Sequence, residues 1–182
     1  MKPKPKLILL GGCVAVGKST IAERYLADHA LTLAINRDAV MSMMGQWLTH
    51  EDEARPYVYE LVKVMIATHL RSGRDVLLPY LLLDAKEAEA FEAIAHENGA
   101  AFVELFLEVS GEDEAVQIAL DRGVWGEGAD PITAESIPIV RELYRRMEEA
   151  LNARPKTVRV PAPRGEIDKT YNAFLHEIET NG

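Results

Sequence analysis

The stretch Leu7–Thr20 reads LILLGGCVAVGKST. Residues 7–10 form an apolar run typical of a short buried strand, a glycine-rich turn follows, and helical periodicity begins at Lys18. Gly12 is followed by four residues and then by Gly17-Lys18-Ser19, which is the spacing of a phosphate-binding loop. A chance glycine turn is the alternative, but it leaves unexplained why strand, loop and helix come in the order that phosphate binding requires.

Glycine in this loop would suit a phosphate because it tolerates positive φ, so that successive amide N–H groups can point inward at an anion. The helix that follows adds the positive end of its dipole. Lys18 would reach the β- and γ-phosphates, and the Ser19 hydroxyl would hold Mg²⁺. ATP or GTP binding follows, and we expect ATP and Mg²⁺ as cofactors. The residues expected to contact the nucleotide are Gly12, Cys13, Val14, Ala15, Val16, Gly17, Lys18, Ser19 and Thr20.

Strand and helix signals alternate along the rest of the chain. Apolar runs predict five strands, at residues 7–10, 32–36, 75–78, 101–108 and 157–160. Helical patterns lie between them, most clearly at residues 53–71. This alternation predicts an α/β protein of three layers, with a five-stranded parallel sheet and helices on both faces. No repeat or linker interrupts the pattern, so we expect one domain over residues 1–182.

The composition restricts the classes of protein that the chain can belong to. Of its 182 residues 48% are hydrophobic, the mean hydropathy is -0.08, and no apolar run approaches the roughly 18 residues of a membrane span. The net charge of -9 disfavours a nucleic-acid partner, because phosphate contacts usually require a basic surface. The single cysteine, Cys13, excludes an internal disulfide and is typical of a cytoplasmic protein. Residues 2–6 are expected to be a solvated tail and not a signal segment.

Two further side chains could take part in phosphate chemistry. Asp38 directly follows the second predicted strand, so we expect it beside the loop of the first strand, at the start of a helix that runs to about Trp47. Its carboxylate could accept a proton, orient the water around Mg²⁺, or cap the helix. Arg122 precedes the glycine-rich segment 123–131, which we expect to be mobile. It could stabilise a transferring phosphoryl group or be a solvated helix-end residue.

The sequence resembles the small P-loop kinases that include the kinase domain of phage polynucleotide kinase and, more loosely, chloramphenicol phosphotransferase and zeta toxins. The shared features are GGCVAVGKST, the segment AINRDAV, the helix at 87–99, and ALDRG followed by DPITAESIPIVRELYRRM. The resemblance implies a kinase with Asp38 as general base and Arg122 as the arginine of a small lid, about residues 111–132. It also implies that the segment 160–163 borders the adenine.

Two departures from the polynucleotide kinases bear on the acceptor. Those enzymes carry an arginine three residues after the base aspartate, where this chain has Met41, and a polar segment after the third strand, where this chain has residues 79–83, PYLLL. Both changes predict a neutral, partly apolar acceptor, although core packing is the alternative for Met41, Met43, Met44 and Trp47. Arg37 could contact an anionic acceptor or face water, and Arg141, Arg145 and Arg146 could simply balance Glu148 and Glu149.

Three functions remain open from the residues. The first is an ATP-dependent phosphotransferase with a small-molecule hydroxyl acceptor, in which Lys18, Asp38 and Arg122 are catalytic and Ser19 holds the metal. The second is a 5'-hydroxyl kinase of oligonucleotides. The third is a nucleotide-binding regulatory protein without transfer activity, which the presence of both a base and a lid arginine disfavours.

Overall fold

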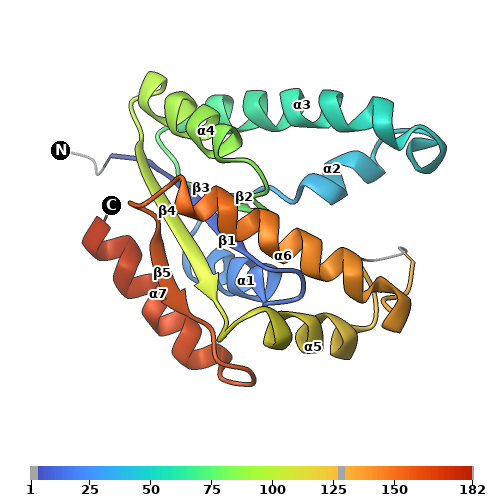
Figure 1. The fold of residues 1–182 in the computed structure, drawn as a ribbon. Helices are drawn as coiled ribbons and strands as arrows, with labels where there is room; N and C mark the ends of the chain where they lie inside the picture. Colours follow the sequence, from blue (N-terminus) through green and yellow to red (C-terminus); the bar gives the residue numbers. More distant parts are fainter. Residues whose placement is uncertain (1–3, 127–129, 182) are drawn as a thin grey trace.

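The computed structural model describes residues 4–126 and 130–181, and Figure 1 shows them as alternating strands and helices. The strands are β1 (Lys6–Gly12), β2 (Leu33–Ala34), β3 (Val76–Pro79), β4 (Ala101–Glu108) and β5 (Val158–Pro161). The helices are α1 (Lys18–Asp28), α2 (Arg37–Ser42), α3 (Glu51–Arg71), α4 (Ala85–Glu97), α5 (Glu112–Arg122), α6 (Ile137–Asn152) and α7 (Ile167–Asn181). Short 3-10 turns lie at Trp47–Thr49 and Ala134–Ser136.

The five strands form one parallel sheet in the order β2-β3-β1-β4-β5, as the α/β pattern of the sequence predicts. Strand β1 lies in the middle, with Leu7 paired to Val76 of β3 on one side and to Phe102 of β4 on the other. The loop after β1 therefore emerges at the centre of the carboxyl edge of the sheet. Ligands of open α/β sheets bind at this edge.

Side chains of β1 alternate between the two faces of the sheet. Leu7 and Leu9 belong to a core shared with α3 and α4, whereas Ile8 and Leu10 belong to a core shared with α1 and α7. Figure 1 shows these two pairs of helices on opposite sides of the sheet. A parallel strand covered on both faces has to be apolar throughout, which explains the run at residues 7–10. Among the described residues no helix is both long enough and apolar enough to cross a membrane.

The segment after β2 differs from the prediction. Strand β2 has only two residues, and α2 ends at Ser42 where a helix to about Trp47 was expected. The reason is local: Gln46 adopts a left-handed conformation with φ of 56°, which an α-helix cannot contain. The placement of Asp38 also differs, because β3 lies between β2 and β1. Asp38 is thus separated from the β1 loop by the width of one strand.

The segment expected to be a mobile loop has more packing than its glycines predict. Val124 and Pro131 form an antiparallel bridge, and the amide of Ile132 donates to the carbonyl of Gly123 at 2.8 Å. Ile132 is buried against Val116 and Val140, from α5 and α6. The described parts of this segment are therefore attached to both helices, while residues 127–129 of the expected lid lie outside the described residues.

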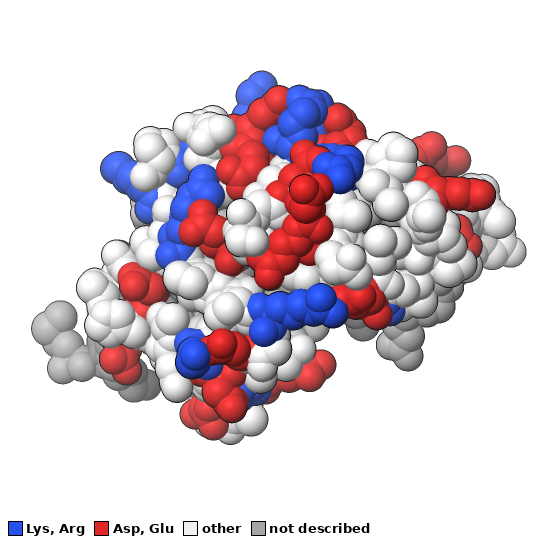
Figure 2. All heavy atoms as spheres, turned by 60° about the horizontal axis from the view of Figure 1, so that its bottom comes forward, with Lys and Arg blue, Asp and Glu red and all other residues white. Residues whose placement is uncertain are grey.

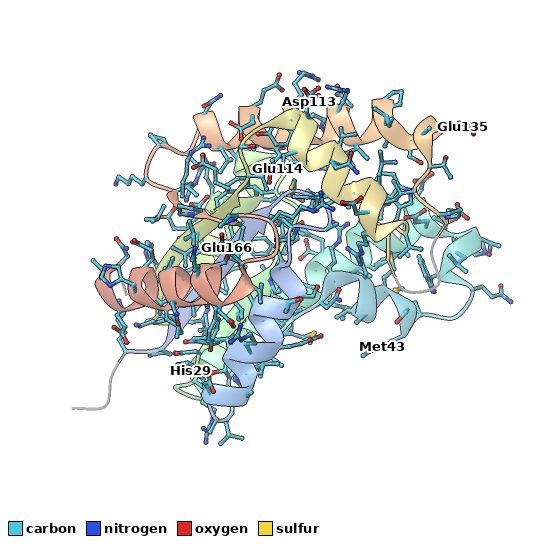
Figure 3. All side chains as sticks on the ribbon, turned by 90° about the horizontal axis from the view of Figure 1, so that it is seen from below. His29, Met43, Asp113, Glu114, Glu135 and Glu166 are labelled. Atoms are coloured by element: carbon cyan, nitrogen blue, oxygen red, sulfur yellow. The ribbon has the colours of Figure 1, made fainter. Side chains whose placement is uncertain are left out.

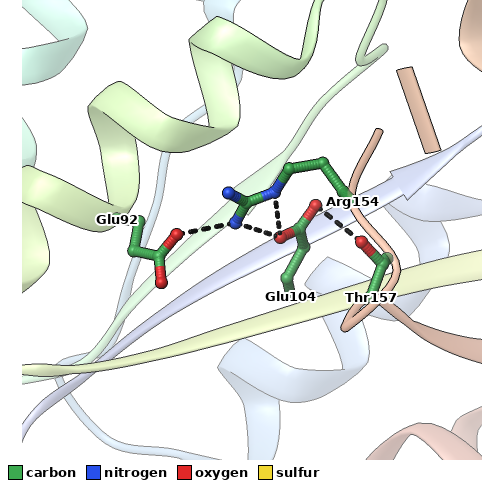
Figure 4. A network of polar contacts seen from close by, with 4 residues as sticks. All are labelled: Glu92, Glu104, Arg154 and Thr157. Atoms are coloured by element: carbon green, nitrogen blue, oxygen red, sulfur yellow. Dashed lines mark hydrogen bonds and ion pairs between the residues drawn. The ribbon is translucent and has the colours of Figure 1, made fainter. Parts of the chain in front are cut away.

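A largely buried polar network ties α4, β4 and the end of α6 together (Figure 4). Arg154 donates to Glu92 at 2.8 Å and to Glu104 at 2.6 Å, and the Thr157 hydroxyl donates to the other carboxylate oxygen of Glu104. The side chain of Glu104 is 8% exposed and that of Arg154 is 15% exposed. The network satisfies a charge on β4 that would otherwise be costly to bury.

We expect Arg154→Met to lower the free energy of unfolding by about 3–5 kcal/mol, because it leaves the Glu104 carboxylate buried without its partner. Arg145→Met is the matched control. Arg145 pairs with Glu142 and Glu149 in solvent, so its loss should lower the free energy of unfolding far less than the loss of Arg154. Urea unfolding measures both, and equal losses in the two variants would contradict a structural role for the buried network.

Candidate nucleotide-binding site

The loop between β1 and α1 has backbone conformations that depend on its glycines. Gly12 has φ of 146° and Gly17 has φ of 101°. A Cβ added to Gly12 would lie 2.8 Å from Cγ1 of Val16 and 3.2 Å from Leu107, so the loop closes over this position without room for a side chain. Ala15 also takes a positive φ, 64°, which is uncommon for a residue other than glycine. The loop is therefore tightly wound between the end of β1 and the start of α1.

The first turn of α1 presents backbone donors at the same place. The amide of Ile21 donates to the carbonyl of Gly17 at 3.0 Å, a helical hydrogen bond at the start of α1. The amides of residues 18–20 precede that bond, and the first N–H groups of a helix have no partner within it. Ser19 and Thr20 are exposed at this end. Such a helix start can accept an anion, and the Ser19 hydroxyl is a suitable oxygen ligand for Mg²⁺.

Lys18 is folded back onto the loop. Its Nζ donates to the carbonyls of Gly12 and Cys13, both at 2.8 Å. Burial lowers the pKa of Lys18 to about 8, with smaller electrostatic contributions from Cys13, Arg122 and Asp38. The last two residues come from α5 and α2, far apart in sequence. Their charges act on the same ammonium group, so the structure brings together the three side chains that the sequence singled out for catalysis.

Asp38 lies in the first turn of α2 with its carboxylate exposed. The cap of this helix is Asn36, whose Oδ1 accepts from the amides of Asp38 and Ala39 at 2.9 and 3.3 Å. The helix-cap alternative for Asp38 is therefore wrong, because the residue two positions earlier occupies the cap. The Asp38 carboxylate remains available to solvent or to a ligand at the carboxyl edge.

Arg122 is the last residue of α5, and Gly123 ends that helix with φ of 73°. The side chain is exposed, and no carboxylate of residues 4–126 and 130–181 lies within ion-pair distance of it. Its charge lowers the pKa of Lys18, as a nearby cation should. An arginine at a helix end near the loop is suitably placed to approach a bound phosphate.

A pocket of about 250 Å³ lies beside the loop, between α5 and the connection from β5 to α7. In Figure 3 Glu114 marks α5 and Glu166 marks that connection. The lining is mostly apolar, with an ion pair of Asp121 and Arg164 at one side. Apolar residues that line the pocket are Ala15, Val16, Ile118, Ala162, Pro163 and Ile167. Ala162 and Pro163 belong to the segment 160–163, which was expected to border the adenine. Ile118 and Ile167 lie in α5 and α7 and belong to no motif that the sequence analysis identified.

The residues that suggested an apolar acceptor belong mainly to the core. Met41 is 4% exposed and Leu82 is 2% exposed, and both pack in the cluster of α3 and α4. They cannot line an acceptor site in this arrangement, so core packing, the alternative for Met41, is correct. Met43 is the opposite case: it is 81% exposed and projects from the molecule in Figure 3.

A polar cluster that the sequence reading missed lies over the end of β3. The Tyr80 hydroxyl donates to Oε1 of Glu87 at 2.8 Å, and the Arg37 guanidinium carbon lies 5.6 Å from the centre of the Tyr80 ring. Burial raises the pKa of Glu87, whereas its bond to Tyr80 and the charges of Arg37 and Arg146 lower it. The stretch PYLLL predicts an apolar surface because the polar partners of Tyr80 lie elsewhere in the sequence, Arg37 in α2 and Glu87 in α4.

Comparisons with solved structures place the fold among the P-loop kinases. A candidate kinase from Chloroflexus aurantiacus matches with a TM-score of 0.70 and 18% identity, over 99% of this chain and all of the other. A gluconokinase from Sinorhizobium meliloti matches with a TM-score of 0.60 and 17% identity, over 98% and 94%. A chain of the Pnkp1/Rnl/Hen1 RNA repair complex matches with a TM-score of 0.65 and 16% identity, over 84% of this chain and 47% of that one.

The protein thus has the three-layer α/β fold of P-loop kinases, as its sequence resemblance implied. It belongs to the AAA_33 family, described as an AAA domain, whose match covers residues 7–119 and so includes the loop and Asp38. No curated protein matches the chain in sequence. The match spans about half the length of the chain from the RNA repair complex.

We expect the Cys13 thiol to be unreactive in the folded protein. Cys13 is buried beside Phe106 and Met147, and burial raises its pKa to about 11. At pH 8 the thiolate fraction should be about 100-fold below that of an ordinary cysteine, because two pKa units separate them. Alkylation with iodoacetamide should therefore be at least about 100-fold slower in the folded protein than in urea. Equal rates would contradict the buried environment of the Cys13 thiol.

Proposed function

We propose that the protein is an ATP-dependent phosphotransferase that moves the γ-phosphate to a hydroxyl group of a small molecule. The observation that carries the proposal is the convergence of Lys18, Asp38 and Arg122 at the carboxyl edge of the sheet, beside a tightly wound glycine loop. Phosphoryl transfer depends mainly on positioning and charge neutralisation, and these side chains provide cations on one side and a carboxylate on the other.

The loop and the start of α1 would hold the nucleotide. Amides of residues 12–20 would surround the β- and γ-phosphates, and the Lys18 ammonium would exchange its bonds to the Gly12 and Cys13 carbonyls for phosphate oxygens. The Ser19 hydroxyl would hold Mg²⁺, which would neutralise phosphate charge. The base would occupy the largely apolar pocket at Ala162 and Pro163. Its mostly apolar lining suits the flat faces of a purine, and we propose adenine.

Asp38 would act on the acceptor. Its carboxylate would take the proton of the acceptor hydroxyl as that oxygen bonds to the γ-phosphorus, while the bond from the γ-phosphorus to the β–γ bridging oxygen breaks and ADP leaves. Arg122 would stabilise negative charge on the transferring group. Asp38 follows β2, and β3 lies between β2 and β1. Two strand spacings, about 10 Å, therefore separate the end of β2 from the end of β1, which is enough for an acceptor to lie between Asp38 and the loop.

The distribution of charge supports a small acceptor over a polynucleotide. On the face shown in Figure 2, Lys and Arg side chains alternate with Asp and Glu and do not form a continuous basic track. The net charge of -9 would also oppose a long polyanion. A 5'-hydroxyl kinase of oligonucleotides is therefore the second candidate, and a regulatory nucleotide-binding protein is the third.

We expect Lys18→Ala to weaken Mg·ATP binding by at least about 10-fold, because it removes a charge-assisted contact to phosphate. The matched control is Lys156→Ala, which removes an exposed lysine before β5 at the other edge of the sheet. Calorimetry of Mg·ATP measures both variants. Absence of any binding by the folded parent protein would overturn the proposed function as a whole.

We expect Asp38→Asn to lower kcat by about 10²–10⁴-fold while Mg·ATP affinity stays within about threefold, because only the proton transfer is lost. Glu97→Gln, an exposed carboxylate at the end of α4, is the control and should leave kcat unchanged. The assay is transfer from γ-labelled ATP to nucleosides, sugars, antibiotics and a single-stranded oligonucleotide. An Asp38→Asn variant with normal turnover would remove Asp38 from the role of base, and preferential labelling of the oligonucleotide would select the second candidate.

A further inference from the structure

Most arginines of this protein are neutralised by a carboxylate. The sequence has twelve arginines, and the structure places seven of them in ion pairs: Arg24, Arg55, Arg141, Arg145, Arg154, Arg159 and Arg164. The others have no carboxylate of the described residues within 4.0 Å, and they are Arg37, Arg71, Arg74, Arg122 and Arg146. In a chain with 29 acidic residues, an arginine without an ion pair is the exception.

These five arginines fall into two groups. Arg71 and Arg74 lie at and after the end of α3, before β3, and therefore at the amino edge of the sheet, away from the loop. Arg37 and Arg122 lie at the carboxyl edge, and Arg122 acts on Lys18 and is part of the proposed nucleotide side. Arg37 precedes Asp38 in α2, and its guanidinium group lies over the ring of Tyr80.

Arg146 faces the same cluster from α6. Ala150, four residues later, is buried in the core that contains Tyr80 and Phe91, so Arg146 lies one turn away on the same face of the helix. Helix α6 lies in the connection between two parallel strands and runs back against their direction (Figure 1). Arg146, which precedes Ala150 in the helix, is therefore nearer to the carboxyl edge. The charges of both Arg146 and Arg37 act on Glu87, which accepts the hydroxyl of Tyr80.

We propose that Arg37 and Arg146 form a subsite for an anionic group of the phosphate acceptor, a carboxylate or a phosphoryl group. The acceptor is thus a small hydroxylated anion, which lies over the end of β3 with its hydroxyl toward Asp38. This inference rests on the proposed function and specifies its acceptor. It replaces the neutral, partly apolar acceptor expected from Met41 and Leu82, since both of those side chains are in the core.

The arrangement at the subsite favours an anion for two physical reasons. Glu87 and the helix-capping Asp84 act on one another, and Glu142 lies one turn before Arg146 on α6, yet none of these carboxylates lies within ion-pair distance of Arg37 or Arg146. Tyr80 is 3% exposed and its hydroxyl donates to Glu87, which fixes the position of that carboxylate. Neither guanidinium group is therefore neutralised by an ion pair, and planar guanidinium groups match carboxylate and phosphate oxygens well.

The test compares acceptors that differ only in charge. The series are glycerol with glycerate and glycerol 3-phosphate, sorbitol with gluconate and sorbitol 6-phosphate, and adenosine with its 3'-monophosphate. Transfer from γ-labelled ATP gives kcat and KM, and calorimetry on protein saturated with a non-hydrolysable Mg·ATP analogue gives binding without turnover. The series also distinguish a carboxylate from a phosphoryl group, and a nucleotide end from a sugar.

We expect at least one anionic member to be bound and phosphorylated in preference to its neutral partner. Arg37→Gln and Arg146→Gln should each raise its KM by about 10- to 100-fold, the value of a charge-assisted contact, with a smaller change in kcat. Mg·ATP affinity should not change in either variant. Arg145→Gln, the neighbouring residue on α6 that is paired with glutamates, and Arg74→Gln, unpaired but at the other edge, should leave the KM as in the parent protein.

Three results would overturn the inference while leaving the proposed function in place. The first is a neutral member that is phosphorylated as well as its anionic partners. The second is an anionic acceptor whose KM is unaffected by Arg37→Gln and Arg146→Gln. The third is Mg·ATP binding without binding or phosphorylation of any anionic member. Failure to bind Mg·ATP would instead reject the proposed function itself.

Discussion

The close approach of the β1–α1 loop to the end of β4 is the constraint on which the rest of the structure depends. Gly12 lies against Leu107, with no space for a Cβ, because β1 is paired on both sides and its last residues remain in the sheet. This fixes the direction in which the loop leaves the sheet and the point at which α1 begins. Lys18 is then held across the loop by two carbonyl groups. If the end of β1 were less tightly packed, the first N–H groups of α1 and the Lys18 ammonium would not be held close together.

Several cations at the carboxyl edge of the sheet are not neutralised by carboxylates. Most arginines of the described residues form ion pairs, including Arg154 in its largely buried network between α4 and β4. Lys18, Arg37, Arg122 and Arg146, by contrast, have no carboxylate of the described residues at ion-pair distance. An excess of unpaired cations destabilises a protein unless something else neutralises it, so their concentration there is typical of a site for anions.

Much of the architecture could be predicted from local pattern. The strand at residues 101–108 has the expected limits, and the helix expected at 53–71 begins only two residues earlier, because continuous apolar runs and helix ends are encoded within a few residues. The short β2, an edge strand that pairs only with β3, could not be predicted from its apolar run. The failure of α2 to reach Trp47 could not be predicted either, since it depends on the left-handed turn at Gln46. Met41 was left open between the core and an acceptor contact for a different reason: a methionine in a helix is compatible with either, and only its neighbours in the fold decide.

By itself the sequence determined the phosphate loop, the parallel three-layer fold and the identity of Lys18, Asp38 and Arg122 as candidates, because each rests on spacing or chain order. Only the tertiary structure decided that one strand separates Asp38 from the loop, that Ile118 and Ile167 complete the pocket beside the loop, and that Arg37, Glu87 and Arg146 lie around Tyr80. Those relations join α2, α4, α5, α6 and α7, which are far apart in the sequence. The sheet order that brings them together arises from packing on both of its faces, which no local stretch of sequence specifies.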